Sequence, residues 1–335
     1  MDHGAAVVRM SDAPPTIAVI VPAFKAVWIV GDCIAHLLAA GFRADEIIVV
    51  DDASPDGTAA ACRNAGVVPH TAPRRLGAAG ARNLGAEKVG RVDILFFVDA
   101  DVLVHSDVRR RVLDRFVAEP DLAAVIGAYD DAPIHPGRVS RFRNLLHHHV
   151  HQESAGEAVT FWTGCGAVRR LDFESVGGFD PEQRMMEDVA FGLKLARRGR
   201  RLLLDPLLRG AHAKGWTLWT MIRSDILDRA IPWTRLQVSG AAAGLPQTLN
   251  LEPRGKASVV MAGLGLAALA TMVVNPIVGI LGFVTALAGI AVVNRKFLAL
   301  AAAQGGTIDA VTTVPLLWIH FTAAGLGYAW VRVMG

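Results

Sequence analysis

The sequence predicts an α/β domain with a mostly parallel, doubly wound sheet, followed by an amphipathic helix at a membrane surface and by transmembrane helices. Two observations carry this prediction. Apolar, β-branched runs alternate with helical stretches through the first 130 residues, and residues 257–294 contain no Asp, Glu, Lys or Arg. Alternating strands and helices build parallel sheets covered on both faces. The predicted parts are a tail (1–15), an α/β domain (16–211), an amphipathic helix with a linker (212–256) and a membrane domain (257–335).

The first βαβ unit consists of a strand at 16–24, a helix at 27–40 and a second strand at 46–50. The alternation then continues with helices at 57–65, 78–89 and 107–119 and with strands at 67–70, 94–98 and 123–129. Residues 130–157 show no regular period, so we expect irregular structure there. The run His147 to His151 falls in this region. Since consecutive histidines do not converge on one ion without a special loop, we expect a loop and not a metal site.

Acidic residues follow two of the predicted strands. Asp51 and Asp52 end the run IIVV before the turn SPDG, and Asp99 and Asp101 follow ILFFV. Open α/β sheets bind their ligands at the carboxyl ends of strands. Asp99 and Asp101 stand at alternate positions of an extended segment, so their carboxylates point to the same side. Such carboxylates can ligate a Mg²⁺ or Mn²⁺ ion that also binds a pyrophosphate. A single Asp-x-Asp is more often a turn or a cap, and the second acidic strand end is what favours a ligand site.

Two further segments combine charge with a helix start. The glycine-rich stretch 74–85 offers backbone N–H groups to an anion, with Arg75 and Arg82 adding charge. An ordinary helix start with surface arginines is the alternative. Glu187 and Asp188 open a predicted helix at 189–198. They are either partners of the helix dipole or, for Asp188, a general base for a hydroxyl group.

The order of these motifs resembles the inverting family-2 glycosyltransferases of the GT-A fold. The resemblance covers residues 16–236 and rests on the whole series, because each motif alone is weak. The motifs are, in order, Val21-Pro22-Ala23, Val50-Asp51-Asp52-Ala53-Ser54, Gly80-Ala81-Arg82-Asn83, Asp99-Ala100-Asp101, Gly177-Gly178-Phe179-Asp180, Glu187-Asp188 and Arg198-Gly199.

This resemblance implies a nucleotide-sugar donor, UDP- or GDP-linked, and a role for each matching residue. Pro22 and Ala23 would line the base and ribose, and Asp52 would accept a hydrogen bond from the base. Arg82 would lie near the phosphates. Asp99 would contact the ribose or the metal, Asp101 would ligate the Mg²⁺ or Mn²⁺, and His212 would complete the metal shell or be a structural histidine. Asp188 would be the base, supported by Glu187.

Other matches are incomplete. The segment FWTGCGAVRR, which contains Gly164, resembles the part that lines the sugar and acceptor pocket. Phe24-Lys25 stands where many members have Tyr-Asn. Of the Gln-x-x-Arg-Trp motif of processive synthases, only Arg229 and Trp233 are present. The resemblance would place both on the acceptor or phosphate side. The incomplete motif favours an enzyme that adds one sugar at a time.

Two rival functions differ from a sugar transfer. A nucleotidyltransferase of related fold would need an N-terminal Gly-x-Gly-x-Arg loop, and VPAFKAVW contains none. A non-catalytic, nucleotide-binding membrane scaffold is the other rival, and the presence of Asp99, Asp101 and Asp188 weighs against it.

Three apolar segments, at 257–274, 277–293 and 310–331, approach the roughly 20 residues that cross a bilayer. Buried helices of a soluble domain are the alternative. Basic residues at 254, 256, 295 and 296 flank the first two segments, which predicts an inner-membrane protein with its catalytic domain in the cytoplasm and its C-terminus on the opposite side. Trp216, Trp219 and Trp233 suit a helix in the interface plane. A helix that packs its apolar stripe on the catalytic domain is the alternative, and one helix can do both. This anchor suggests a lipid or lipid-linked acceptor, and a growing surface glycan is the alternative.

The remaining composition narrows the range of partners. A net charge of +3 is too small to indicate nucleic acid as a partner, and no targeting peptide is visible before residue 16. The three cysteines, Cys33, Cys62 and Cys165, have no metal-binding or CxxC spacing and are expected to be single packed residues. The identity of the sugar, the nucleotide and the acceptor depends on pocket shape.

Overall fold

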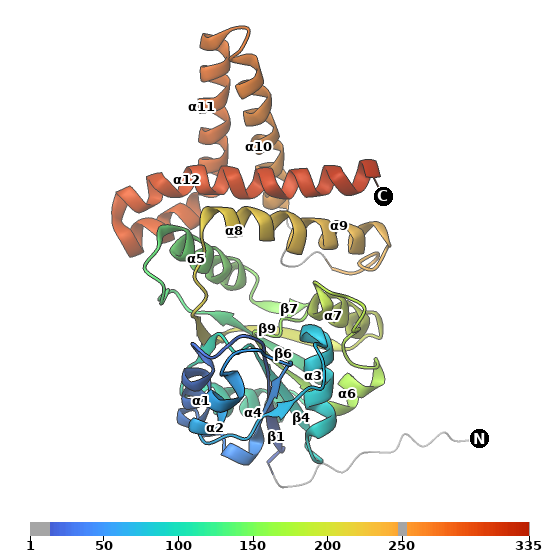
Figure 1. Ribbon diagram of the computed structural model, residues 1–335. Coiled ribbons are helices and arrows are strands. Elements are labelled where there is room, and N and C mark those ends of the chain that lie inside the picture. The colour runs from blue at the N-terminus through green and yellow to red at the C-terminus, as the bar shows by residue number, and fades with distance from the viewer. Residues whose placement is uncertain (1–13, 247–252, 335) are drawn as a thin grey trace, which may run out of the picture.

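The computed structural model describes residues 14–246 and 253–334. The predicted tail therefore lies almost entirely outside the described residues, and so does part of the predicted linker. Figure 1 shows an α/β domain at the base, a layer of helices above it and a helical hairpin rising from that layer.

A nine-stranded sheet forms the centre of the α/β domain, in the order β3-β2-β1-β4-β8-β6-β9-β5, with β7 paired to β9. The strands are β1 (Ile17–Ala23), β2 (Ile47–Asp51), β3 (His70–Thr71), β4 (Ile94–Val98), β5 (Val102–Val104), β6 (Leu122–Tyr129), β7 (Gly156–Ala158), β8 (Cys165–Arg169) and β9 (Arg201–His212). The strands β3, β2, β1 and β4 run parallel, as the βαβ alternation predicted. The later strands add antiparallel pairs, and β6 pairs with β9 in parallel.

Helices cover both faces of the sheet, so the parallel strands are buried on two sides (Figure 1). One core contains side chains of α1, α2 and α4, and the other contains side chains of α3, α6 and α7. Every residue of β4 is buried, which explains why its sequence reads as a continuous apolar run. The bounds are α1 (Val30–Ala39), α2 (Thr58–Asn64), α3 (Gly77–Lys88), α4 (Val108–Ala118), α6 (Arg170–Ser175) and α7 (Glu187–Arg197), with a 3₁₀ turn at Ala44–Glu46.

The prediction of irregular structure at residues 130–157 was wrong. Helix α5 spans Arg138–Glu153 and includes the histidine run, which therefore does not form a loop. Its buried apolar residues Phe142, Leu145 and Leu146 follow the helical period. Four histidines and several polar residues between them hid this period in the sequence. The side chain of Asn144 donates to the Asp130 carbonyl (2.8 Å), which ties α5 to the end of β6.

Above the sheet lies a helical rod made of α8 (Leu218–Arg223), a π-helical segment η2 (Ser224–Ala230) and α9 (Ile231–Val238). The predicted helix near residues 212–236 is this rod. Strand β9, which runs to His212, and a connection of five residues precede it. The π-helix is notable because such segments are rare and often occur at functional sites.

The C-terminal part consists of α10 (Pro253–Thr271), α11 (Pro276–Val293) and α12 (Arg295–Met334). The helices α10 and α11 form the predicted hairpin around Asn275, whose side chain caps α11. Gly306, with φ 78° and ψ −179°, divides α12 into two helices. Among the described residues, α11 and α12 are long and apolar enough to cross a membrane. The third predicted span falls on the part of α12 that follows Gly306.

Candidate active site

The carboxyl ends of β1, β2 and β4 meet at one edge of the sheet and bring the first acidic motifs together. Pro22 and Ala23 end β1, and the backbone N–H of Asp52 donates to the Ala23 carbonyl (2.8 Å). The buried carboxylate of Asp52 accepts hydrogen bonds from the backbone N–H groups of Leu76 (2.6 Å) and Gly77 (3.0 Å). It therefore holds the glycine-rich loop at the start of α3, a contact that the sequence did not reveal.

An arginine stacks beside this loop. The Arg75 guanidinium lies 3.2 Å from the Phe24 ring centroid and also donates from Nε to Asp52 (3.0 Å). Phe24 is the residue that departs from the family pattern, and in the structure it forms a flat surface together with Arg75. A planar surface of this kind next to Asp52 is suited to stacking with a nucleotide base.

Arg82 connects α3 to two of the predicted acidic sites. Its side chain is 4% exposed, and it donates from Nη1 to Glu187 (2.6 Å) and from Nη2 to Asp99 (2.7 Å). Burial alone disfavours the charged guanidinium, but the carboxylates of Asp99, Glu187 and Asp188 outweigh burial and raise the pKa of Arg82. The guanidinium is thus engaged by carboxylates, and it fixes Asp99 and Glu187 relative to each other.

Asp188 lies in the first turn of α7, next to this ion pair. Burial, together with the neighbouring charge of Glu187, raises the pKa of Asp188 from 3.8 to about 7, and Arg82 opposes that rise. The backbone N–H and the hydroxyl of Thr163 lie 3.4 Å from Asp188 Oδ2. Met186, the residue that precedes α7, has φ 63°, a left-handed conformation that is costly for a residue with a side chain. A carboxylate with a pKa near 7 can take up a proton at neutral pH.

Asp101 and His212 form a separate pair at the same edge. The Nε2 atom of His212, at the end of β9, lies 3.5 Å from Asp101 Oδ2. Burial raises the pKa of Asp101, but the hydrogen bond and charge of His212 and the charge of Lys214 outweigh it, so the net shift is downward. An ionised oxygen and an imidazole nitrogen are ligands that Mn²⁺ accepts. Over residues 14–246 and 253–334, no group of three or more His, Cys, Asp or Glu side chains is arranged to hold a metal ion. Substrate oxygens or water would have to complete such a shell.

A group of rings that sequence reasoning missed lies beside this pair. The rings of His212 and His147 both lie parallel to that of Tyr129, with centroids 4.4 Å and 5.6 Å away. The Nε2 atom of His147 accepts a hydrogen bond from Arg229 Nη1 (2.7 Å). Burial, followed by the charge of Arg229, holds the pKa of His147 well below its usual value, so the ring is neutral and can accept this bond. The structure thus brings His147 into the site.

Arg229 itself has an unusual environment. Within the part of the chain that the structure describes, no carboxylate lies within 4.0 Å of its guanidinium. Burial and the nearby charge of Arg143 lower the pKa of Arg229 to about 9, although Asp225 and Asp188 counteract them. This cation on the π-helix therefore has unused capacity to bind an anion.

The remaining predicted residues border the same region. Gly164 precedes β8, and a side-chain carbon there would lie 2.2 Å from the Trp162 ring. Trp162 in turn meets Tyr129 edge to face, with ring centroids 4.6 Å apart. Trp233 on α9 packs against a cluster that includes Val189 and Leu193 of α7. The helical rod therefore packs on the α/β domain beside Asp188.

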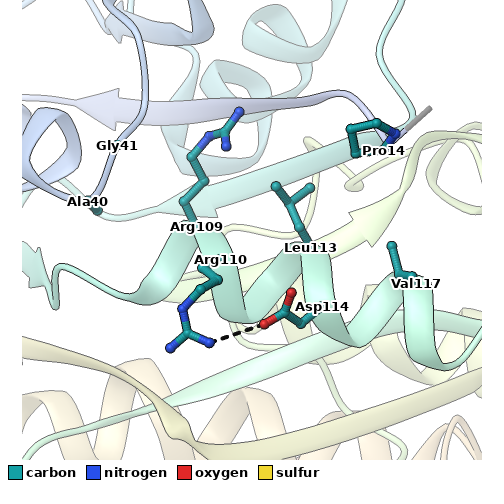
Figure 2. A pocket seen from close by; sticks show the side chains of 8 residues that line it. All are labelled: Pro14, Ala40, Gly41, Arg109, Arg110, Leu113, Asp114 and Val117. Carbon is teal, nitrogen blue, oxygen red and sulfur yellow. Dashed lines mark hydrogen bonds and ion pairs between the residues drawn. The ribbon is translucent and has the colours of Figure 1, made fainter.

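A shallow pocket elsewhere on the domain does not belong to this site. It lies between the end of α1 and helix α4, and Figure 2 shows its lining with an ion pair between Arg110 and Asp114. Pro14, which precedes β1, also lines it. The pocket is thus near the amino end of β1, whereas the acidic residues lie at the carboxyl ends of the strands.

The fold and the site define an α/β protein of the GT-A type, with an acidic edge suited to a nucleotide. Residues 18–177 match the model of glycosyl transferase family 2. The chain therefore carries a glycosyl transferase family 2 domain, as the resemblance predicted.

Curated relatives agree with this assignment, and a solved structure has a similar fold. The chain is 24% identical over 213 residues to the poly-beta-1,6-N-acetyl-D-glucosamine synthase of Staphylococcus aureus strain COL, which covers 61% of this chain and 50% of the relative. The protein of strain MSSA476 is 25% identical over the same length. The chain thus spans about half the length of these relatives. The mannosyltransferase PcManGT of Pyrobaculum calidifontis, solved with GDP-Man and Mn²⁺, superposes with a TM-score of 0.60 at 20% identity, covering 95% of this chain and 88% of that one.

Proposed function

We propose that the protein is a membrane-bound, inverting glycosyltransferase that moves one sugar from a nucleotide-diphospho-sugar to a lipid or lipid-linked acceptor at the cytoplasmic face of the inner membrane. The observation that carries the proposal is Asp188. A carboxylate with a pKa of about 7 stands beside Glu187, and Arg82 connects Glu187 to Asp99, two residues before Asp101 of the Asp101–His212 pair. Base and metal-binding groups thus share one edge of the sheet.

The donor side of the proposal uses the residues around β1, β2 and β4. Pro22, Ala23 and the Phe24–Arg75 surface would hold the nucleoside, and Asp52 would fix the loop that closes around it. Asp101 and His212 would hold Mg²⁺ or Mn²⁺ together with the diphosphate. When bound, the ion would neutralise the negative charge that grows on the departing diphosphate. The GDP-Man and Mn²⁺ bound to PcManGT support this donor class by analogy of fold.

The chemical step would be a direct displacement at the anomeric carbon. The acceptor oxygen would attack C1 of the sugar while the bond from C1 to the diphosphate oxygen breaks, and the acceptor proton would pass to Asp188. Burial and the charge of Glu187 would keep the pKa of Asp188 raised, Arg82 would oppose that rise, and Thr163 would orient the carboxylate. Attack opposite the leaving group inverts the anomeric centre. Buried Cys165 has a raised pKa, which makes its thiol a poor nucleophile, and this agrees with a path without a covalent intermediate.

Arg229 and Trp233 would serve the acceptor or phosphate side. Arg229 has a neutral partner in His147 and free capacity for an anion, and Trp233 packs where α9 meets α7. Both belong to the rod of η2 and α9, which lies beneath α12 in the layer from which the apolar hairpin rises (Figure 1), and this placement supports an acceptor that arrives from the membrane.

The test is thermal stabilisation of the detergent-solubilised full chain by UDP, GDP, ADP and CDP, with and without Mn²⁺. We expect one nucleotide to give a Mn²⁺-dependent shift, because ligands that bind the folded state stabilise it. Asp101→Ala should lose that shift, and Asp114→Asn, on the exposed face of α4, should keep it. If no nucleotide stabilises a folded wild-type chain, the glycosyltransferase assignment fails and the non-catalytic scaffold gains support.

The matching activity assay follows transfer from the donor that binds. Asp188→Asn should retain nucleotide binding and lose turnover by about 10²- to 10⁴-fold, the usual contribution of a general base. Unchanged turnover in this variant would exclude Asp188 as the base.

A further inference from the structure

The second helix of α12, after Gly306, lies across the base of the α10–α11 hairpin and runs beside the α8–η2–α9 rod (Figure 1). Two close contacts fix this placement. A side-chain carbon added at Gly327 would lie 2.5 Å from the Cβ atom of Ala230 in η2. On another side, Trp318 Nε1 lies 3.3 Å from the Ala262 carbonyl of α10. The helix is therefore packed between the rod and the hairpin.

A buried ion pair joins this helix to the α/β domain. His320 Nδ1 lies 2.8 Å from Asp225 Oδ2 in η2, and Asp225 Oδ1 lies 2.5 Å from Arg143 Nη2 in α5. The side chains of Asp225 and Arg143 are each 1% exposed. Helix α5 is in turn attached to β6, because His148 Nδ1 lies 2.8 Å from the Tyr129 carbonyl. The middle of the second helix of α12 is thus linked to α5 through Asp225 of the rod.

This link to α5 conflicts with a transmembrane path for the second helix of α12. A helix of residues 307–334 that crossed the bilayer would place His320 near the middle of the hydrocarbon. Asp225 and Arg143 would have to enter with it, and so would α5 and the edge of the sheet. Charged groups and polar loops in hydrocarbon are strongly unfavourable. The hairpin has no such constraint. Its helices of 19 and 18 residues, at about 1.5 Å per residue, approach the thickness of a bilayer core. Of the two, α11 is long and apolar enough to cross a membrane by itself, and α10 carries basic residues at 254 and 256 in its first turn and no charged residue after them.

We infer that only the α10–α11 hairpin crosses the bilayer, and that the second helix of α12 lies with the α8–η2–α9 rod against the lipid headgroups on the cytoplasmic side. The C-terminus then stays on the same side as the catalytic domain. This topology differs from the expectation that the third apolar segment carries the C-terminus across. The inference rests on the proposed membrane location, and it adds the topology and the lipid-facing surface.

The side chains of the two-helix layer suit a headgroup surface. It exposes apolar and aromatic residues next to arginines, the composition typical of helices that lie in a membrane interface. The exposed apolar members include Leu218, Trp219, Val238, Leu326, Tyr328 and Trp330. The exposed arginines are Arg223, Arg235 and Arg332, and Arg254 and Lys296 stand near the hairpin base, where both pair with Glu153. Such basic groups favour anionic lipids.

The test is labelling of introduced cysteines with a membrane-impermeant maleimide, in intact cells and after permeabilisation. Val274 at the hairpin tip is 88% exposed and Val333 near the C-terminus is 81% exposed, so each accepts a cysteine without loss of packing. The three native cysteines are buried and serve as the unlabelled background. Asp114→Cys, on the surface of α4, marks the side of the catalytic domain.

We expect Val274→Cys to react in intact cells, and Val333→Cys and Asp114→Cys to react only after permeabilisation. Met334→Cys gives a second reading of the C-terminus. Labelling of Val333→Cys and Met334→Cys in intact cells would overturn the inference, and so would protection of Val274→Cys until permeabilisation. Labelling does not depend on turnover. A chain that transfers sugar but has its C-terminus outside would refute the topology alone, and an inactive chain with the expected labelling would refute the function alone.

Discussion

The raised pKa of Asp188 makes a quantitative prediction about stability as well as catalysis. Its pKa is about 7 in the folded protein, compared with 3.8 for an ordinary aspartate. The folded state therefore binds this proton more tightly than the unfolded state does. The stabilising contribution is complete below pH 3.8 and is lost as the pH rises through 7. At pH 8 the buried negative charge destabilises the fold.

The variant Asp188→Asn removes the charge and keeps the shape. A shift of about 3 pKa units corresponds to roughly 4 kcal/mol as an upper value, at about 1.4 kcal/mol per unit. Between pH 5 and pH 8, the wild-type protein loses the stabilisation that corresponds to about two of these pKa units. Over that range the free energy of unfolding of the variant should therefore rise by roughly 3 kcal/mol relative to that of wild type. For a chain of this size we expect a rise of several degrees in the melting temperature.

The assay is thermal unfolding of both proteins in detergent from pH 5 to pH 8, without nucleotide or metal. Asp114→Asn, on the exposed face of α4, is the matched control and should show no pH-dependent gain. In parallel, wild-type kcat/KM should fall about tenfold per pH unit below pH 7, because the base becomes protonated. A constant difference between variant and wild type across the pH range, or a wild-type acid limb near pH 4, would refute the reasoning.

Three other perturbations test different parts of the structure. Arg82→Gln should destabilise the fold by about 3–5 kcal/mol in thermal unfolding, because Glu187 and Asp99 lose their cation; equal stability would show that the ion pairs contribute nothing. Asp225→Ala should lower the free energy of unfolding by a similar amount, because it leaves Arg143 buried without its carboxylate. A double variant that also carries Arg143→Met should recover much of this lost stability. The three cysteines should resist iodoacetamide until the protein unfolds, since all are buried; rapid labelling of the folded chain would contradict their placement.

Much of the fold could be predicted from the sequence because its signals are local. The strands β1, β2 and β4 are continuous apolar runs, and the parallel strands must meet with their carboxyl ends at one edge. The positions of Asp52 and Asp99 follow from that rule. Helix α5 could not be predicted in this way, since its histidines weaken the apolar period that marks a helix.

The partners of the site residues could not be predicted. The sequence places Arg82 and Asp99 in separate motifs, and only the folded chain shows that they form an ion pair. The sequence also could not show that the carboxylate of Asp52 accepts hydrogen bonds from the backbone N–H groups of residues 76 and 77. His147 carried no site signal until α5 placed it against Tyr129 and Arg229.

The sequence by itself determined that the chain has an α/β domain with acidic strand ends and an apolar C-terminal part, because residue period and composition are properties of neighbouring residues. Only the tertiary structure decided the pKa of Asp188, the pairing of Asp101 with His212 and the course of α12. These depend on distances between residues far apart in the chain, such as His320 and Asp225, which are 95 positions apart and 2.8 Å from each other. Burial and charge act through space, and the packing of the folded chain sets those distances.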